Sequence, residues 1–282
     1  MSSNNDRLDK IEKNVKKGTH KSSPYPNDFY KFTKLIGLPK HPATLQAMDF
    51  MSHQRDFVKE ATRKGQRKIH VNKSRQIGYT EIVLRILQFL CFTKYQGGKI
   101  MIIAGTREKT SKKIMHRFKQ LFNNIRTTVS DDRNDLKMKL TNGTEIEALP
   151  SNSDAIRGDT KINCIFIDEA AHFNRIDDSI VLDAIEPIVM TNKSDIFMIS
   201  TPNGPVGFFY DVDISENDYT KLKADIWDAA GWIYSKEEAE KELERVDMDT
   251  DQEYLNKYTT GRDSIWGEVT DEHRSDEEEM EL

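Results

Sequence analysis

Apolar residues along the chain recur in two alternating patterns. Residues 68–72 alternate between polar and apolar positions, as in a strand, and short apolar runs typical of strands occupy residues 99–104, 162–167 and 196–200. Apolar positions spaced three or four residues apart predict helices over 82–91, 107–122 and 176–190. Strands that alternate with helices indicate right-handed crossovers and a mostly parallel sheet flanked by helices. The pattern therefore predicts the α/β fold class.

One segment departs from this alternation. Residues 136–149 form two stretches of alternating apolar and polar positions around Asn142 and Gly143. This residue pair favours the positive φ angles of a tight turn, so the segment predicts a β-hairpin. Upstream, Leu45, Met48 and Phe50 lie on a stretch that we expect to be helical, and this stretch contains Gln46.

The 282 residues suit one large domain with short appendages. Residues 1–27 have no apolar periodicity and predict a flexible basic arm, residues 28–262 the folded domain, and residues 263–282 an acidic tail. The net charge of −5 conceals a strong asymmetry. Residues 1–75 contain 17 basic and 7 acidic side chains, whereas residues 264–282 contain one arginine and 8 acidic side chains. An anionic partner for the basic front therefore remains open.

Several classes of protein are excluded. The longest apolar stretch, residues 82–92, is interrupted by Arg85 and Gln88 and is shorter than the roughly 20 residues of a membrane helix. The N-terminus lacks the apolar stretch of a secretory signal. Cys91 and Cys164 each lie in an apolar run, which favours buried thiols in a reducing compartment over a disulfide or a zinc site. We expect a cytoplasmic protein without a membrane partner.

The first candidate for chemistry is the loop between the strand at 68–72 and the following helix. A phosphate-binding loop needs backbone N–H groups at a helix N-terminus, a lysine, and a hydroxyl for Mg²⁺. Gly78 and Thr80 fit this pattern, but the usual pattern has lysine where this chain has Tyr79. Lys73, at the front of the loop, could reach the same phosphates. The candidate nucleotide-binding residues are Lys73, Ser74, Arg75, Gln76, Ile77, Gly78, Tyr79 and Thr80.

The second candidate is a pair of acids that ends the apolar strand 162–167. In this position Asp168 would hold Mg²⁺ together with Thr80, and Glu169 would act as the general base for the attacking water. The alternative is an ordinary strand end with solvated acids. The two motifs are about 90 residues apart and each ends a predicted strand, so together they favour ATP and Mg²⁺ chemistry.

The third candidate follows the strand 196–200. Ser200, Thr201 and Asn203 could contact the γ-phosphate or its water and so distinguish ATP from ADP. A plain turn is the alternative, because Pro202, Asn203 and Gly204 favour turns.

In combination, these motifs resemble the ATPase domain of the large terminase subunits of tailed phages. The similarity extends from about His41 to Tyr258, and Ser-Thr-Pro-Asn-Gly at 200–204 is its most specific part. Some terminases carry a deviant phosphate loop with lysine at its front and Gly-Tyr-Ser/Thr behind, which Lys73 and Tyr79 match. The resemblance implies a P-loop NTPase of the ASCE or RecA-like type that hydrolyses ATP to translocate double-stranded viral DNA into the procapsid.

The resemblance also assigns roles to particular positions. Gln46 corresponds to the adenine-reading glutamine, and Arg75 to a loop arginine that stabilises charge on the γ-phosphoryl group. Ser200, Thr201 and Asn203 correspond to the motif that couples hydrolysis to movement. Arg157 matches a position of the family to which we assign no role.

The resemblance further implies a set of partners. These are double-stranded DNA bound through its phosphates, a portal protein, a small terminase subunit and a homo-oligomeric ring on the portal, all in the host cytoplasm. The DNA surface would be the basic arm together with the basic helix residues Arg107, Lys109, Lys112, Lys113, Arg117 and Lys119. A solvated helix face explains the same charges.

One feature departs from the family. Large terminases usually continue into an RNase H-type nuclease domain, for which about 25 residues after Tyr254 leave no room. We therefore expect no nuclease in this chain, and a separate nuclease subunit remains open. The alternative functions are a helicase-like P-loop DNA translocase, because Asp168 to His172 resembles the helicase box, or a non-hydrolysing nucleotide-binding scaffold.

Overall fold

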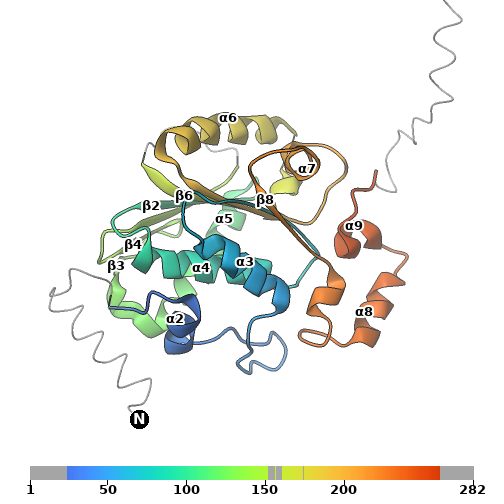
Figure 1. The fold of residues 1–282 in the computed structure, drawn as a ribbon, viewed down its shortest axis with the longest axis horizontal. Helices are drawn as coiled ribbons and strands as arrows, with labels where there is room; N and C mark the ends of the chain where they lie inside the picture. Colours follow the sequence, from blue (N-terminus) through green and yellow to red (C-terminus); the bar gives the residue numbers. More distant parts are fainter. Residues whose placement is uncertain (1–23, 152–155, 157–160, 174, 261–282) are drawn as a thin grey trace, which may run out of the picture.

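The computed structural model describes residues 24–260, except 152–155, 157–160 and 174. Within these residues an eight-stranded sheet forms the centre of the domain, with helices on both faces (Figure 1). The strand order is β3-β4-β5-β2-β6-β7-β1-β8. The neighbouring strands in the run β5-β2-β6-β7-β1-β8 are parallel, and the pairs β3-β4 and β4-β5 at one edge are antiparallel. The α/β fold class with a mostly parallel sheet is confirmed.

The strands of the sheet are short. Their bounds are β1 Lys68–Lys73, β2 Lys99–Ala104, β3 Val129–Asp131, β4 Lys137–Leu140, β5 Glu145–Leu149, β6 Ile162–Asp168, β7 Asp195–Ser200 and β8 Thr220–Ala224.

Helices cover the two faces unequally. α6 (Arg175–Asn192) and α7 (Phe208–Ile214) lie on one face, and α2 (Phe29–Ile36), α3 (Ser52–Thr62), α4 (Tyr79–Thr93) and α5 (Glu108–Gln120) lie on the other. Alternation along β2 explains the two cores, because Ile100 and Ile102 pack under α4 while Met101 and Ile103 pack under α6. Among the described residues, none of the helices combines the length and apolar character needed to span a membrane.

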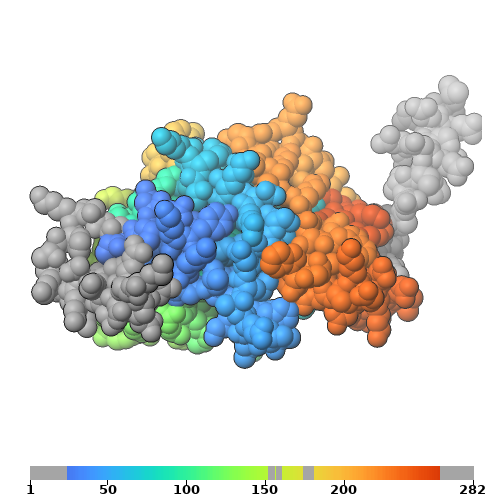
Figure 2. Space-filling model, turned by 60° about the horizontal axis from the view of Figure 1, so that its bottom comes forward, coloured from blue at the N-terminus to red at the C-terminus, as the bar shows by residue number. Residues whose placement is uncertain are grey.

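The C-terminal part of the described chain lies beside its N-terminal part. The 3₁₀ helix η4 (Ile226–Ala229), α8 (Lys236–Leu243) and α9 (Thr250–Leu255) follow β8. In Figure 2 these orange to red segments adjoin the blue residues of the N-terminal helices, and α3 contacts β8. Two further 3₁₀ helices are η1 (Asn123–Thr128), which follows α5, and η3 (Ala170–His172), which follows β6.

Most of the predicted elements are present. The strands at 68–72, 99–104, 162–167 and 196–200 correspond to β1, β2, β6 and β7, and the hairpin turns at Gly143 with φ +86°. The helix expected around Gln46 is wrong, because residues 41–50 form turns and extended chain. The packed core also begins before Asp28, where the domain boundary was placed, since Tyr25 is buried against Phe32 and Phe92.

Other expectations lie outside the described residues. These are most of the basic arm, the whole acidic tail, and Arg157.

A buried ion pair joins the N-terminal ends of β1 and β7, at the opposite edge of the sheet from the loops that follow these strands. Arg67 precedes β1 and Asp195 begins β7; their side chains are 2% and 1% exposed and form an ion pair. The Asp195 carboxylate also accepts a hydrogen bond from the Arg67 backbone N–H and forms an ion pair with Lys94. Burial disfavours the charged carboxylate, but the Arg67 hydrogen bond and charge hold the pKa of Asp195 below its usual value.

We expect Asp195→Asn to lower the free energy of unfolding by about 3–5 kcal/mol, because it leaves the Arg67 guanidinium buried without its anion. Urea denaturation at pH 7 measures the loss. Since the folded-state pKa is lowered, the contribution of Asp195 is present above the pKa of an unfolded aspartate and disappears as the pH falls through the folded-state value. Asp218→Asn is the matched control, because Asp218 is 68% exposed beside Lys68 and should cost less than about 1 kcal/mol. Equal losses in the two variants would contradict this account.

Candidate functional site

Three neighbouring parallel strands bring the candidate residues to one edge of the sheet. β7 lies between β6 and β1, with Asp168 opposite Ile199 and Asn72 opposite Ser200. Lys73 ends β1, Asp168 ends β6 and Ser200 ends β7. Ligands of α/β proteins bind at the carboxyl ends of such strands.

The loop after β1 has the backbone shape of an anion site. Gln76 and Gly78 have positive φ angles of 58° and 81°, which turn the chain back into the N-terminus of α4. The positive φ favours glycine at position 78, and a Cβ there would lie 2.7 Å from the Gln54 side-chain nitrogen and displace that side chain. The first backbone N–H groups of α4 therefore point toward whatever anion lies in front of the loop.

Two cross-strand contacts join the loop to the acids after β6. The Lys73 ammonium lies 3.0 Å from a carboxylate oxygen of Glu169, and the Thr80 hydroxyl donates to Asp168 over 3.3 Å. Burial, reinforced by the adjacent Glu169 charge, raises the pKa of Asp168 to about 7. Burial also opposes the charged form of Glu169, but the Lys73 ammonium lowers its pKa overall. The site therefore places two carboxyl groups in different electrostatic environments.

The backbone of Glu169 has a left-handed conformation, with φ 53° and ψ 46°. A non-glycine residue held in this region stores strain, and such residues cluster at functional sites. The conformation turns the chain sharply after β6 and keeps the carboxylate beside Lys73 rather than in line with the strand.

The segment after β7 binds to the segment after β6. Ser200 accepts a hydrogen bond from the Ala171 backbone and lies 3.5 Å from Glu169; Asn203 donates to the Ala171 carbonyl. Thr201 contacts the His172 ring over 2.7 Å. The three residues expected to couple hydrolysis to movement thus contact the segment that carries Glu169, and only Thr201 also lines a cavity.

Tyr79 does not point into the loop. Its side chain is 2% exposed and packs against His53 and Phe57 of α3. Position 79 can offer a ligand only its backbone N–H, which leaves Lys73 as the lysine near the phosphate site.

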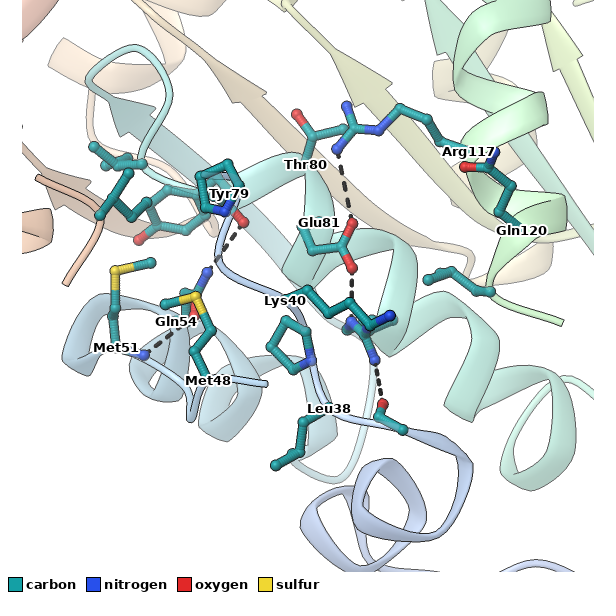
Figure 3. A pocket seen from close by; sticks show the side chains of 18 of the residues that line it. Leu38, Lys40, Met48, Met51, Gln54, Tyr79, Thr80, Glu81, Arg117 and Gln120 are labelled. Carbon is teal, nitrogen blue, oxygen red and sulfur yellow. Dashed lines mark hydrogen bonds and ion pairs between the residues drawn. The ribbon is translucent and has the colours of Figure 1, made fainter. Parts of the chain in front are cut away.

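An open cleft of about 870 Å³ lies between the loop, the N-terminal segment and α5 (Figure 3). Its lining includes Lys73, Gln76, Ile77, Gly78, Tyr79, Thr80 and Glu169. A second cavity of about 550 Å³ shares Lys73, Gln76 and Glu169 with the first and adds Arg75, His172, Thr201 and Glu253. The two cavities therefore meet at the Lys73–Glu169 pair. Ser74 is buried and lines neither.

The C-terminal helix α9 holds the loop from one side. Glu253 binds Arg75 through its carboxylate, at 3.4 Å, and through its backbone carbonyl, which accepts the Arg75 N–H. The neighbouring Gln252 accepts from the Gly204 N–H. The sequence indicated Arg75 but gave no sign of Glu253, which lies 178 positions later in a segment of mixed polarity.

Gln46, the expected adenine-reading residue, is exposed and lies outside the cleft lining. Gln54, at the start of α3, lies in its place at the cleft wall. Its amide accepts from the Met51 N–H and donates to the Gly78 carbonyl, as Figure 3 shows. The helix expected at 45–50 is absent, and the first helix after His41 starts at Ser52, so the adenine-reading role of Gln46 stays a prediction from the sequence. Two features could have indicated Gln54: its place in the first turn of that helix and the short distance to the loop in sequence.

The basic helix α5 is also less available for DNA than its sequence suggests. Arg117 lines the cleft, Lys112 pairs with Glu108, and Lys119 donates to the carbonyls of Asp132 and Asn134. Half of the six expected DNA-binding residues are thus engaged within the domain.

Comparison with solved structures gives related folds. The ATPase domain of the Thermus phage P74-26 large terminase matches with a TM-score of 0.61 and 21% identity, over 83% of this chain and 99% of that one. The HK97 bacteriophage large terminase matches with a TM-score of 0.62 and 18% identity, over 76% of this chain and 51% of that one. The large terminase of the thermophilic bacteriophage D6E in complex with ADP matches with a TM-score of 0.57 and 13% identity, over 74% of this chain and 54% of that one. The matched region thus spans about half the length of these last two proteins, and at such identities the likeness establishes the fold.

Comparison with protein families establishes the relationship itself. Residues 71–282 match the family described as "Terminase large subunit, T4likevirus-type, N-terminal", and this range contains the loop after β1, the acids after β6 and the segment after β7. The chain therefore belongs to the terminase large-subunit family of the T4-like type and has the fold of its ATPase domain.

Proposed function

We propose that this chain binds Mg·ATP in the cleft, hydrolyses it, and uses the energy to translocate double-stranded viral DNA. The observation that carries the proposal is the meeting of Lys73, Thr80, Asp168 and Glu169 in front of the N-terminus of α4. These are the residue types that phosphoryl transfer to water requires: a lysine, a hydroxyl, a metal-binding carboxylate and a general base.

The phosphates of ATP would lie against the loop. Backbone N–H groups of residues 76–80 and the Lys73 ammonium would bind them, and Arg75 is close enough to the second cavity to stabilise charge on the γ-phosphoryl group. Glu169 is the only carboxylate in both cavity linings, and it remains ionised beside Lys73. It is therefore the group that can accept a proton from the attacking water.

The residues present fit a magnesium ion. The Asp168 carboxylate and the Thr80 hydroxyl lie 3.3 Å apart, so the two side chains offer adjacent oxygen donors of the kind that magnesium prefers. Asp168 and Thr80 would hold Mg²⁺, which supplies neutralisation of charge on the β- and γ-phosphates.

The base of the nucleotide would occupy the part of the cleft that the N-terminal segment and the start of α3 line. Leu38, Met48 and Met51 supply apolar side chains there, and Gln54 supplies a polar one, as the labelled side chains of Figure 3 show. This arrangement suits a flat purine ring.

The partners follow from membership of the family. We infer that the chain acts in the host cytoplasm with double-stranded DNA, a portal protein and a small terminase subunit, as a ring of like subunits. DNA would be bound through its phosphates, as suits a motor that moves along any sequence. Electron microscopy of the protein on portal and DNA tests the ring, and a single bound copy would contradict it.

We expect Glu169→Ala to reduce phosphate release in the presence of DNA and portal by at least about a hundredfold, because the attacking water loses its base. ATP binding should persist, since Lys73 loses its competing anion. Phosphate release by the unaltered protein that does not exceed that of the variant would overturn the ATPase proposal and favour a non-hydrolysing nucleotide-binding scaffold.

Lys73→Ala should abolish ATP turnover, because it removes the only lysine side chain in both cavity linings. Tyr79→Phe is the comparison at the position of the usual lysine. Its hydroxyl has only a long contact of 3.4 Å to the His53 carbonyl, so turnover should change by less than about threefold. The reverse pattern would return the phosphate-binding role to position 79.

Gln54→Ala should weaken ADP binding by roughly tenfold, because the amide holds both the start of α3 and the Gly78 carbonyl at the cleft wall. Gln46→Ala should leave it unchanged, since Gln46 lies outside the cleft lining. Fluorescence titration with a labelled ADP compares the two. A loss confined to Gln46→Ala would restore the assignment made from the sequence.

A further inference from the structure

The α5 wall of the cleft carries Arg117, a cation whose ion pair with Glu81 is long. Arg117 lies in the last turn of α5, and Figure 3 shows its side chain extending across the cleft to Thr80 and Glu81 at the start of α4. Its side chain is 50% exposed and it lines the cleft. Its nearest anion, the Glu81 carboxylate, lies 3.8 Å from the guanidinium, beyond hydrogen-bond distance.

Glu81 already has a closer partner. Arg85 donates to Glu81 over 2.7 Å, and its other nitrogen donates to the Gly37 carbonyl over 2.7 Å. These two hydrogen bonds and the low exposure of its side chain, 10%, hold Arg85 in place. Arg117 therefore is not needed to satisfy Glu81 and retains donors that point into the cleft.

The position of Arg117 is close to the reacting end of the site. Thr80, next to it in Figure 3, donates to Asp168. A guanidinium there faces the same space as the N–H groups of the α4 N-terminus.

We propose that Arg117 binds the phosphates of ATP from α5, as a third cation beside Lys73 and Arg75. A guanidinium can donate two parallel hydrogen bonds to a phosphate, which a lysine ammonium does not. The inference rests on the proposed function, since it concerns the substrate of the same cleft.

Competition binding with ATPγS and with adenosine tests the proposal. Arg117→Gln should weaken ATPγS binding by about tenfold, the loss expected for a charge-assisted hydrogen bond, and leave adenosine binding unchanged. Lys112→Gln is the matched control: it removes the same charge from the same helix, but Lys112 pairs with Glu108 and lies outside the cleft lining. It should bind both ligands like the unaltered protein.

A second variant separates phosphate binding from a role as counter-ion to Glu81. If Arg117 contacts phosphate, Glu81→Gln releases it and ATPγS binds at least as tightly as before. If Arg117 serves only Glu81, then Glu81→Gln weakens ATPγS binding as much as Arg117→Gln, and the proposal is overturned. ATPγS binding by Arg117→Gln within twofold of the unaltered protein also overturns it. Failure of the unaltered protein to bind ATPγS would instead refute the proposed function.

Discussion

The ion pair between Lys73 and Glu169 is the contact on which the site depends. Lys73 ends β1 and Glu169 follows β6, and these two strands are not neighbours, because β7 lies between them. Strands one place apart are about 4.8 Å from each other, so these two are separated by roughly twice that distance. A lysine side chain can cross it only if the intervening strand ends in a small residue, and β7 ends in Ser200. The register that aligns Asn72 with Ser200 therefore permits the pair.

The same arrangement makes three loops into one mechanical unit. Ser200, Thr201 and Asn203 contact the chain between Glu169 and His172, and Gln252 of α9 contacts Gly204. The adjacent Glu253 holds Arg75 in the loop after β1. A shift of Glu169 would be transmitted through hydrogen bonds to the end of β7 and from there to α9. Under the proposed function, these contacts would connect hydrolysis to the C-terminal segment.

The sequence predicted the parts of this site that depend on local pattern. Three apolar runs predicted β2, β6 and β7, because strands buried on both faces are nearly continuously hydrophobic, and alternation at 68–72 predicted β1. The same reasoning could not find β8, whose residues are mostly half-buried at the sheet edge, or the three-residue β3. Glu253 and Gln54 were missed for a different reason. Their positions follow from tertiary packing, and polar residues on short amphipathic helices carry no periodic signal of the loop they contact. Gln46 shows the converse error, in which a motif was placed on a helix that did not form.

Three of the cations that line the two cavities have carboxylate partners. Lys73 pairs with Glu169, Arg75 with Glu253, and Arg85 with Glu81. Such pairs lower the cost of keeping charges in a partly dehydrated space, since an unpaired charge there would be unfavourable. A triphosphate that binds Lys73 replaces one anion by another, so the cation stays paired while Glu169 loses its partner. The released carboxylate would then stand beside the phosphate, with Ser200 and His172 near it. Under the proposed function, nucleotide binding and the release of the proposed general base would therefore be one electrostatic event, because the lysine cannot fully compensate both anions at once.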